Sequence, residues 1–359
     1  MEKFEHGGNI YRAALQLKIS EDKIIDFSAN INPLGLSVNL RNALINGIDN
    51  IKHYPDPQYT SLIKSIAVWE GVEENKIIVG NGATEIIYEF IRVLEPKRAL
   101  ILAPTFVEYE RALRRIRCQV EYFYLKEENS FRIDDSFPEL LSGYDLVIIC
   151  NPNNPTSQLA EAPMMLKTLN VCKEQGINLI VDEAFIDFVD DQKKSTMVPY
   201  INSYDNLYII KALTKFFAIP GLRIGYGITS NKNILNRMIT EKQPWSINSM
   251  AALAGEVVMK DSNYIKESIE FMRIERDYLY REIKSIDLIK VFEPKANYIL
   301  FKILVAGKNI ETHLLNNRLL IRNCSNYRNL SEAYYRVAVK HRENNDNLIE
   351  KLKEVLDES

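Results

Sequence analysis

Residues 207–229 read LYIIKALTKFFAIPGLRIGYGIT, and this stretch decides the fold that the sequence predicts. It begins with the apolar run Leu207–Ile210 and ends with a second β-type run, Arg223–Thr229. Between them Lys215 stands among apolar neighbours, where loss of water would lower the pKa of its amine and favour a nucleophile. A lone lysine is far more often a solvated surface residue. The stretch therefore indicates a candidate catalytic lysine after a buried strand, provided that the rest of the chain also alternates strands and helices.

The preceding residues do alternate apolar runs with helical patterns. Five further strands are expected, at Ile77–Val79, Ala99–Ala103, Val120–Tyr124, Leu146–Cys150 and Asn178–Val181. Helical patterns separate several of them, such as Glu85–Val93 and Pro163–Gln175, and the second opens with the proline that a first helical turn tolerates. Buried runs separated by helices predict an α/β fold with a mostly parallel central sheet and helices on both faces.

The pattern changes near residue 250. A long charged helix is expected at about 263–283, followed by strands Tyr298–Ile303 and Tyr335–Val339 and a helix at Asn344–Leu356. We therefore predict a large domain at 46–250. Residues 1–45 and 251–359 should form a smaller α+β domain, whose N-terminal segment closes over the site.

Charge and cysteine usage exclude several classes of protein. The 359 residues contain 45 Lys and Arg against 48 Asp and Glu, a net charge of −3 that argues against a nucleic-acid partner. The four cysteines (Cys118, Cys150, Cys172, Cys324) are widely spaced, which predicts buried thiols rather than disulfides or a metal site. The charged N-terminal residues do not resemble a secretory signal, and no apolar run approaches the roughly 20 residues of a membrane span. We expect a cytoplasmic protein without a membrane partner.

A glycine-containing loop follows the first of these strands. Residues 80–85 read GNGATE and lead into an apolar-periodic helix. Free backbone N–H groups and the positive end of the helix dipole would favour a phosphate there, and Thr84 could add its hydroxyl. An ordinary helix cap by Thr84 or Asn81 is the alternative.

Polar residues also follow two other strands. Residues 151–156 read NPNNPT, where two Asn-Pro steps indicate a stiff turn that displays amide side chains. Asp182 and Glu183 follow the next strand, and a carboxylate there is costly to bury without a positive partner. Each signal alone also fits a turn or a helix cap. Their order, each motif after a strand, indicates one site at the carboxyl edge of the sheet.

In this order the motifs resemble those of the fold-type-I, pyridoxal-phosphate-dependent aminotransferase superfamily. The matching residues are Gly82-Ala83-Thr84, Asn154-Pro155-Thr156, Asp182-Glu183-Ala184 and Thr214-Lys215 with Gly221-Leu222-Arg223. The histidinol-phosphate aminotransferase branch is nearest, and within it the threonine-phosphate decarboxylases. That finer match involves His6–Asn9, Asp26–Gly35, Asp182–Phe188, Gln243–Ser246 and Leu320–Cys324.

The resemblance implies a pyridoxal 5′-phosphate site. Lys215 would bind the cofactor covalently and move a proton, Asp182 would pair with the ring nitrogen, and Phe106 would stack on the ring. Cofactor contacts are implied for Gly82, Ala83, Thr84, Asn154, Asp182, Thr214, Lys215, Arg223 and Tyr54. Tyr54 would reach the phosphate from the neighbouring subunit, so the resemblance also implies a homodimer.

The resemblance further implies a phosphorylated amino-acid substrate. Arg336 would receive its carboxylate and Arg322 its phosphate; the implied substrate residues are His6, Gly8, Asn9, Asn32, Asn154, Arg322 and Arg336. The implied reaction is decarboxylation of L-threonine O-3-phosphate to (R)-1-amino-2-propanol O-2-phosphate in cobalamin biosynthesis. Transamination of histidinol phosphate or an aromatic amino acid is the alternative, and a serine-phosphate substrate stays open because one methyl group discriminates only about 10–200-fold. A non-catalytic regulator would be expected to carry a DNA-binding module, for which we see no room before His6.

Three positions depart from the superfamily pattern. Ala212 replaces a serine that contacts the cofactor phosphate, which would cost about 1 kcal/mol of binding. Ser157 replaces the last glycine of Asn-Pro-Thr-Gly, and Phe185 replaces a tyrosine that reaches the ring's 3-oxygen. Lys215 and Asp182 are retained, so these changes do not exclude catalysis. Arg111, Arg114, Arg115 and Arg117 are expected on a solvated helix face, or at the mouth of the site where they would steer an anion.

Overall fold

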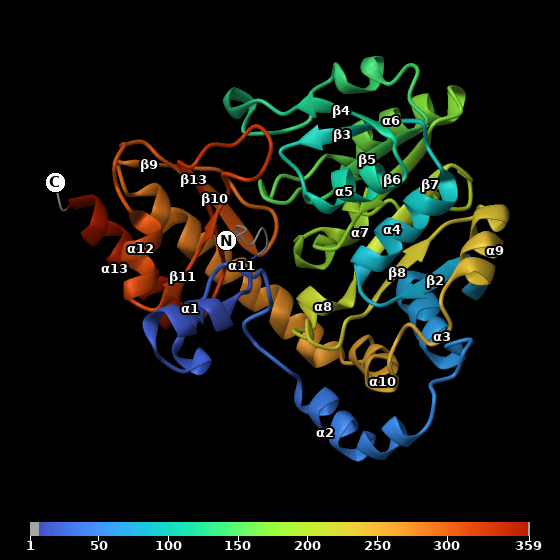
Figure 1. Cartoon of the computed structure of the whole chain (residues 1–359), viewed down its shortest axis with the longest axis horizontal. Coiled ribbons are helices and arrows are strands. Elements are labelled where there is room, and N and C mark those ends of the chain that lie inside the picture. Colours follow the sequence, from blue (N-terminus) through green and yellow to red (C-terminus); the bar gives the residue numbers. More distant parts are fainter. Residues whose placement is uncertain (1–6, 358–359) are drawn as a thin grey trace.

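The computed structural model describes residues 7–357, and its main sheet has seven strands (Figure 1). Their order across the sheet is β2 (Ile77–Gly80), β8 (Gly225–Ile228), β7 (Leu207–Ala212), β6 (Asn178–Asp182), β5 (Leu146–Cys150), β3 (Arg98–Ala103) and β4 (Gln119–Tyr124). All seven strands expected from the sequence are present, within two residues at either end.

The sheet is mostly parallel, as predicted. Strands β7, β6, β5, β3 and β4 run parallel, whereas β8 lies antiparallel to both β2 and β7. The register pairs Cys150 with Asp182, so the last residues of β5 and β6 meet at one edge. This carboxyl edge is where ligands bind in open α/β sheets.

Helices cover both faces because successive strand residues point to opposite sides. Ile148 and Ile180 point to one face, which α4 (Ala83–Leu94), α5 (Glu108–Arg115) and α9 (Lys232–Glu241) cover. Val147 and Val181 point to the other face, which α3 (Thr60–Glu70), α6 (Ala162–Glu174) and α10 (Ser249–Val258) cover. All four cysteines are buried, as expected, and none of them forms a disulfide in this structure.

A second sheet lies beside the first (Figure 1). It has the antiparallel order β12 (Arg322–Asn323), β13 (Tyr334–Ala338), β10 (Tyr298–Ile303) and β9 (Ile289–Val291). The surrounding helices are α1 (Ile10–Leu17), α11 (Ser262–Lys284), α12 (Ile310–Asn316) and α13 (Arg342–Asp357). One buried apolar cluster includes residues of both sheets, such as Val181 and Phe301. The division into domains at 46–250 and 1–45 with 251–359 stays a prediction.

The chain segment 25–32 joins the two sheets. Strand β1 (Ile25–Asp26) pairs in parallel with β11 (Leu319–Leu320). The Phe27 carbonyl then accepts a hydrogen bond from the Ala338 N–H at 2.8 Å. Finally, the Asn32 N–H donates to the Lys215 carbonyl at 3.1 Å. The early segment therefore reaches the strand–helix junction that carries the candidate lysine.

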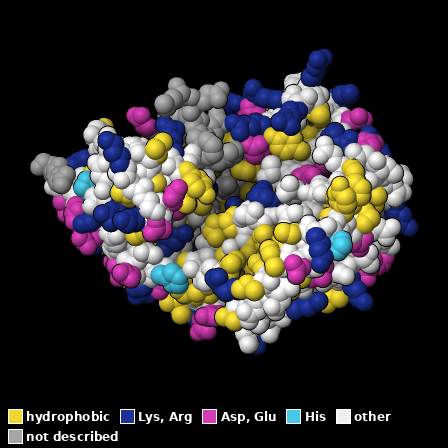
Figure 2. All heavy atoms as spheres, turned by 60° about the horizontal axis from the view of Figure 1, so that its bottom comes forward, with side chains coloured by type: hydrophobic (Ala, Val, Ile, Leu, Met, Phe, Trp, Pro, Cys, Tyr) yellow, Lys and Arg dark blue, Asp and Glu magenta, His cyan; other side chains and the backbone are white. Residues whose placement is uncertain are grey.

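An exposed apolar surface lies around α2 (Val38–Asn46) and the turn after it. Figure 2 turns this part forward and shows many apolar side chains on it. The exposed apolar residues here are Val38, Ile45, Ile48, Ile51, Tyr54 and Trp245. Between residues 7 and 357, no helix is long and apolar enough to cross a membrane.

Candidate active site

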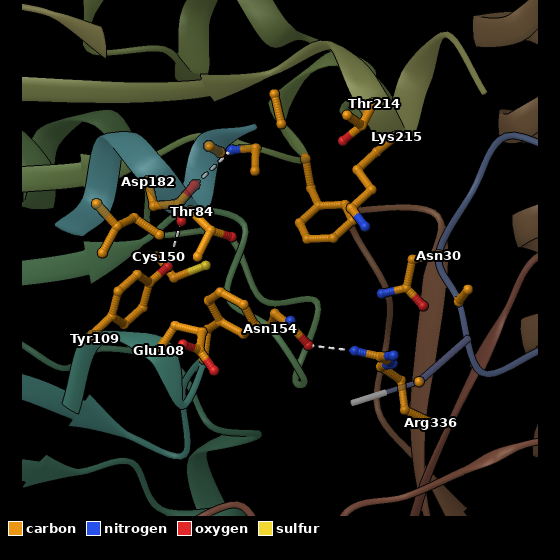
Figure 3. Close-up of a pocket in the computed structure, with 18 of the residues that line it drawn as sticks. Asn30, Thr84, Glu108, Tyr109, Cys150, Asn154, Asp182, Thr214, Lys215 and Arg336 are labelled. Atoms are coloured by element: carbon orange, nitrogen blue, oxygen red, sulfur yellow. Dashed lines mark hydrogen bonds between the residues drawn. The ribbon is translucent and has the colours of Figure 1, made fainter. Parts of the chain in front are cut away.

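A cavity of about 610 Å³ lies at the carboxyl edge of the main sheet (Figure 3). Nine of the predicted site residues line it: Ala83, Thr84, Phe106, Asn154, Asp182, Thr214, Lys215, Arg223 and Arg336. They come from segments spread over more than 250 residues of the sequence. The fold therefore brings together most of the site that the sequence motifs predicted.

Lys215 lies on the short helix α8 (Leu213–Phe216), directly after β7, and its amine points into the cavity (Figure 3). Burial and the nearby cations Arg223 and Arg336 lower the pKa of Lys215 to about 8. A substantial fraction of the amine is therefore uncharged near neutral pH and can act as a nucleophile or a base.

Asp182 is the last residue of β6 and its carboxylate is buried. One oxygen accepts a hydrogen bond from the Tyr109 hydroxyl at 2.6 Å and the other accepts one from the Ala184 N–H at 3.0 Å. Burial raises the pKa of Asp182 to about 6 in spite of these donors. A buried carboxylate of this kind would be stabilised by a cationic partner in the cavity.

A cradle for an anion lies at the first turn of α4. Gly82 caps this helix with a φ of 86°, and a Cβ there would lie 2.4 Å from a guanidinium nitrogen of Arg223. A Cβ on Gly225 would meet the Ala83 nitrogen at 2.4 Å. The two glycines thus allow Arg223 and β8 to approach the helix N-terminus, where Thr84 lines the cavity. Backbone N–H groups and an arginine together suit a phosphate.

Asn154 and Arg336 lie on the side of the cavity that faces the second sheet. Arg336 donates to the Asn154 side-chain oxygen at 2.6 Å (Figure 3). It also donates to the Ser28 carbonyl at 2.6 Å. Its buried Nε has no hydrogen-bond partner among the described residues, and neither has the side-chain oxygen of Asn30, which lines the same cavity. These open donor and acceptor positions are available to a ligand.

The structure does not bring Asn32 to this cavity. Its side chain donates to the Phe216 carbonyl and the Ser268 hydroxyl, both at 2.8 Å, and accepts from the Leu34 N–H. With its amide used in protein contacts, Asn32 supports the loop rather than facing the space where a substrate fits. Asn30 occupies that place instead.

Two predicted residues lie around a neighbouring cavity of about 260 Å³. Asn9 and Arg322 line it, and Asn9 also caps α1 through the Arg12 N–H. Gly8 lies next to them and donates its N–H to the Ser28 hydroxyl at 2.7 Å. Because Gly7 and Ser28 border both cavities, the two spaces are adjacent. His6 lies outside the described residues.

Tyr54 does not line the cavity of its own chain. Its side chain is 79% exposed and packs against Trp245, with ring centroids 4.7 Å apart. The contact of Tyr54 with the cofactor of a neighbouring subunit therefore stays a prediction.

The sequence reasoning missed Asn30 and Tyr109 and left Arg111 open. Asn30 stands two residues before Asn32 in the same motif, and only the path of the loop decides which amide faces the cavity. Tyr109 follows Phe106 by three residues, a spacing that places two side chains on one side of a helical turn. Arg111 lines the cavity and forms an ion pair with Glu108 at 2.7 Å.

The three departures have structural consequences. Ala212 lines the cavity and offers no hydroxyl. Ser157 has a φ of 60°, and its hydroxyl accepts the Ala296 N–H at 2.9 Å, a contact that a glycine would lack. Phe185 packs edge-to-face on Tyr298, with centroids 4.9 Å apart.

A cluster of charges lies buried next to the site. Lys211 on β7 lies 3.1 Å from a Glu183 oxygen and 3.5 Å from a Glu70 oxygen. The Tyr226 hydroxyl donates to Glu70. Asp187 is also buried here, and burial raises its pKa to about 7 while Lys211 opposes that rise. Glu183 follows Asp182 directly, so this cluster fixes the chain beside the candidate active site.

Known proteins are similar to this chain in sequence and in fold. A family model described as aminotransferase class I and II matches residues 22–352. The threonine-phosphate decarboxylase of Salmonella typhimurium is 40% identical over 352 residues, 98% of this chain and 96% of that protein. The adenosylcobalamin biosynthesis bifunctional protein CobDQ of Leptospira interrogans is 34% identical over 358 residues, 96% of this chain and 40% of that protein. The crystal structure of the histidinol-phosphate aminotransferase from Clostridium acetobutylicum has a TM-score of 0.87 and 36% identity, covering 93% of this chain and 99% of that chain.

Proposed function

The chain belongs to the aminotransferase class I and II family, and from this premise we propose that it is a pyridoxal-phosphate-dependent decarboxylase of L-threonine O-3-phosphate. The products would be CO₂ and (R)-1-amino-2-propanol O-2-phosphate, and the pathway cobalamin biosynthesis. The observation that carries the proposal is the 40% identity over nearly the full length of both chains to a threonine-phosphate decarboxylase. The Leptospira relative supports the pathway.

The cavity fits pyridoxal 5′-phosphate. Three kinds of group line it: an amine with a lowered pKa (Lys215), a buried carboxylate (Asp182) and an anion cradle in which Arg223 lies against Gly82. These groups match the aldehyde, the ring nitrogen and the phosphate of the cofactor, respectively. When bound, this cofactor supplies an electron sink that stabilises negative charge on the substrate's α-carbon.

The protein's own residues then have distinct tasks. Lys215 would hold the cofactor through its amine and would afterwards hold a proton near the substrate. Asp182 would keep the ring nitrogen protonated, and Phe106 would limit movement of the ring. Asn154, which is held by Arg336, lies within the same cavity and can orient a ring oxygen.

The two adjacent cavities support a substrate with two anionic ends. Arg336 faces the larger cavity and would bind the carboxylate, whereas Arg322 lines the smaller one and would bind the phosphate. Whether the carboxylate or a hydrogen leaves the α-carbon depends on how these two arginines orient the substrate. Fixing both ends is therefore the means by which this site would select decarboxylation.

A homodimer is part of the proposal. Tyr54 is exposed and packs against Trp245, and Ile48 and Ile51 shortly before it in the chain are exposed as well. Figure 2 shows apolar side chains gathered on this face. An apolar surface of this kind is typical of an interface between subunits. A second copy would cover it and would allow Tyr54 to approach the partner's cofactor phosphate.

Transamination of histidinol phosphate is the second candidate, since a structure at 36% identity carries that name. One assay separates the two. The protein with pyridoxal phosphate receives L-threonine O-3-phosphate without a keto acid, and CO₂ is measured. Sustained CO₂ release, with the cofactor returning to its aldehyde form, is the expected result. No CO₂, together with conversion of the cofactor to its amine form by histidinol phosphate, would show an aminotransferase.

A further inference from the structure

One side of the cavity is formed by two aromatic residues at the start of α5. Phe106 precedes the helix and Tyr109 lies within its first turn, three residues later. Their rings meet edge-to-face, with centroids 5.7 Å apart and planes at 82°. Figure 3 shows Tyr109 pointing towards Asp182. The same turn that would place an aromatic ring on the cofactor thus also reaches the carboxylate that would pair with it.

The Tyr109 hydroxyl is fully buried and donates to Asp182 at 2.6 Å. Burial and the charge of Asp182 raise the pKa of Tyr109 well above 10, so the hydroxyl stays protonated and remains a donor. Cys150 lies beside both groups, and burial raises the pKa of its thiol, which stays neutral.

Two further charged groups act on Asp182. Burial is the main cause of its raised pKa, and the neighbouring Glu183 raises it further. Lys215 and the Tyr109 hydroxyl lower it. The Tyr109 hydroxyl is a side-chain donor in direct contact with the Asp182 carboxylate. Among the groups that keep Asp182 ionised it makes the largest contribution.

We propose that Tyr109 is a positioning residue that holds the Asp182 carboxylate in place and keeps it ionised for the ring nitrogen of pyridoxal phosphate. The inference rests on the proposed cofactor. Among residues 7–357, Tyr109 donates to one Asp182 oxygen and Ala184 to the other, so each oxygen retains a lone pair. Tyr109 would therefore act on the cofactor through Asp182 rather than by touching the ring nitrogen itself.

The test compares two ligands in binding to the wild-type protein and to Tyr109→Phe. One ligand is pyridoxal phosphate, and the other is its analogue in which carbon replaces the ring nitrogen. Affinity is read from the absorbance and fluorescence of the bound ligand, without turnover. Tyr109→Phe removes only the hydroxyl. At pH 5, below the pKa of Asp182, we expect about tenfold weaker binding of pyridoxal phosphate, equivalent to about one pKa unit on Asp182, and unchanged binding of the analogue.

The pH dependence gives a second readout. Asp182 pairs with the ring nitrogen only when it is ionised, so affinity falls as the pH drops through its pKa. Loss of the hydroxyl raises that pKa, and the fall in affinity should begin about one pH unit higher in the variant. Tyr208→Phe is the matched control, because Tyr208 is equally buried and its hydroxyl bonds to Asn178 and Asn231 instead. Tyr208→Phe should change neither the affinity for pyridoxal phosphate nor the affinity for its analogue.

If Tyr109→Phe weakened the binding of both ligands equally, the inference would be overturned, because the hydroxyl would then only maintain the shape of the cavity. Unchanged binding of both ligands would overturn it too. Failure of the wild-type protein to bind pyridoxal phosphate would overturn the proposed function as well. Absence of CO₂ release would overturn only the proposed reaction, since the binding comparison does not depend on it.

Discussion

Replacing Lys211 by methionine should destabilise the protein strongly although the residue lies outside the cavity. Its side chain is only 1% exposed, and its amine is the cation shared by Glu70 and Glu183. Methionine keeps a stem of similar length, so packing changes little and the charge is what is lost. The substitution therefore tests how much one buried cation contributes to this fold.

The magnitude follows from the carboxylates that remain. Removing one partner of a buried ion pair costs about 3–5 kcal/mol, because the other charge stays buried without compensation. Here two glutamates lose their cation, and Asp187 loses the group that opposes the rise of its pKa. We expect a loss of about 3–5 kcal/mol in the free energy of unfolding.

The loss should grow with pH. The pKa of Asp187 in the folded protein is already raised to about 7, so folding takes up a proton below that pH. Without Lys211 the pKa of Asp187 rises further. The stability of the variant therefore continues to fall between pH 7 and 8, whereas titration of Asp187 changes the stability of the wild type little in this range. If the pKa of Asp187 rises by one unit, the loss of stability in the variant becomes about 1 kcal/mol larger at pH 8 than at pH 6.

Urea unfolding of both proteins at pH 6 and pH 8 measures these differences. Lys194→Met is the matched control, because that lysine is 81% exposed and pairs with Asp191 at 3.3 Å. It should change stability by less than about 0.5 kcal/mol. A loss in Lys211→Met as small as in this control, or one that is the same at both pH values, would refute the reasoning.

Four other predictions concern the site and the loop beside it. Lys215→Ala should abolish CO₂ release and the absorbance of covalently bound cofactor, and retained activity would contradict its assigned role. Because the pKa of Lys215 is lowered to about 8, the rate of cofactor attachment to the cofactor-free protein should rise with pH with a midpoint near 8, as stopped-flow absorbance can measure. Arg322→Ala should raise KM far more for phosphorylated than for unphosphorylated substrates; an equal effect on both would show that the phosphate binds elsewhere. Asn32→Ala should lower the free energy of unfolding by about 2 kcal/mol through two lost buried hydrogen bonds, without selectivity for phosphorylated substrates in kinetic assays.

The strands of the main sheet could be predicted because each is a short apolar run that is buried on both faces. Leu146–Cys150 and Tyr298–Ile303 were expected at the same bounds that the structure has. Strands of two residues, such as β11 and β12, carry too little pattern to be detected. The antiparallel direction of β8 also leaves no mark in its own composition, because direction depends on the path of the connection.

Site residues could be predicted where a motif fixes both the chemistry and the place. Asp182 and Lys215 follow strands directly, and the structure puts both at the same cavity. The choice between Asn30 and Asn32 depends on which way a loop turns, and no local pattern shows that. Tyr109 was missed since its partner Asp182 is 73 residues away in the sequence.

The segment 25–32 also constrains how the protein is made. It leaves the ribosome early, but the strands that hold Phe27 contain Leu320 and Ala338, which are made almost a whole chain later. At about 5–20 residues per second the segment waits roughly 15–60 s for these partners. During that time the nascent chain already contains Lys215 and Asp182 but lacks one wall of the cavity. The site is thus completed only in the last moments of synthesis, and a chain that stopped before β13 would leave it permanently open on that side.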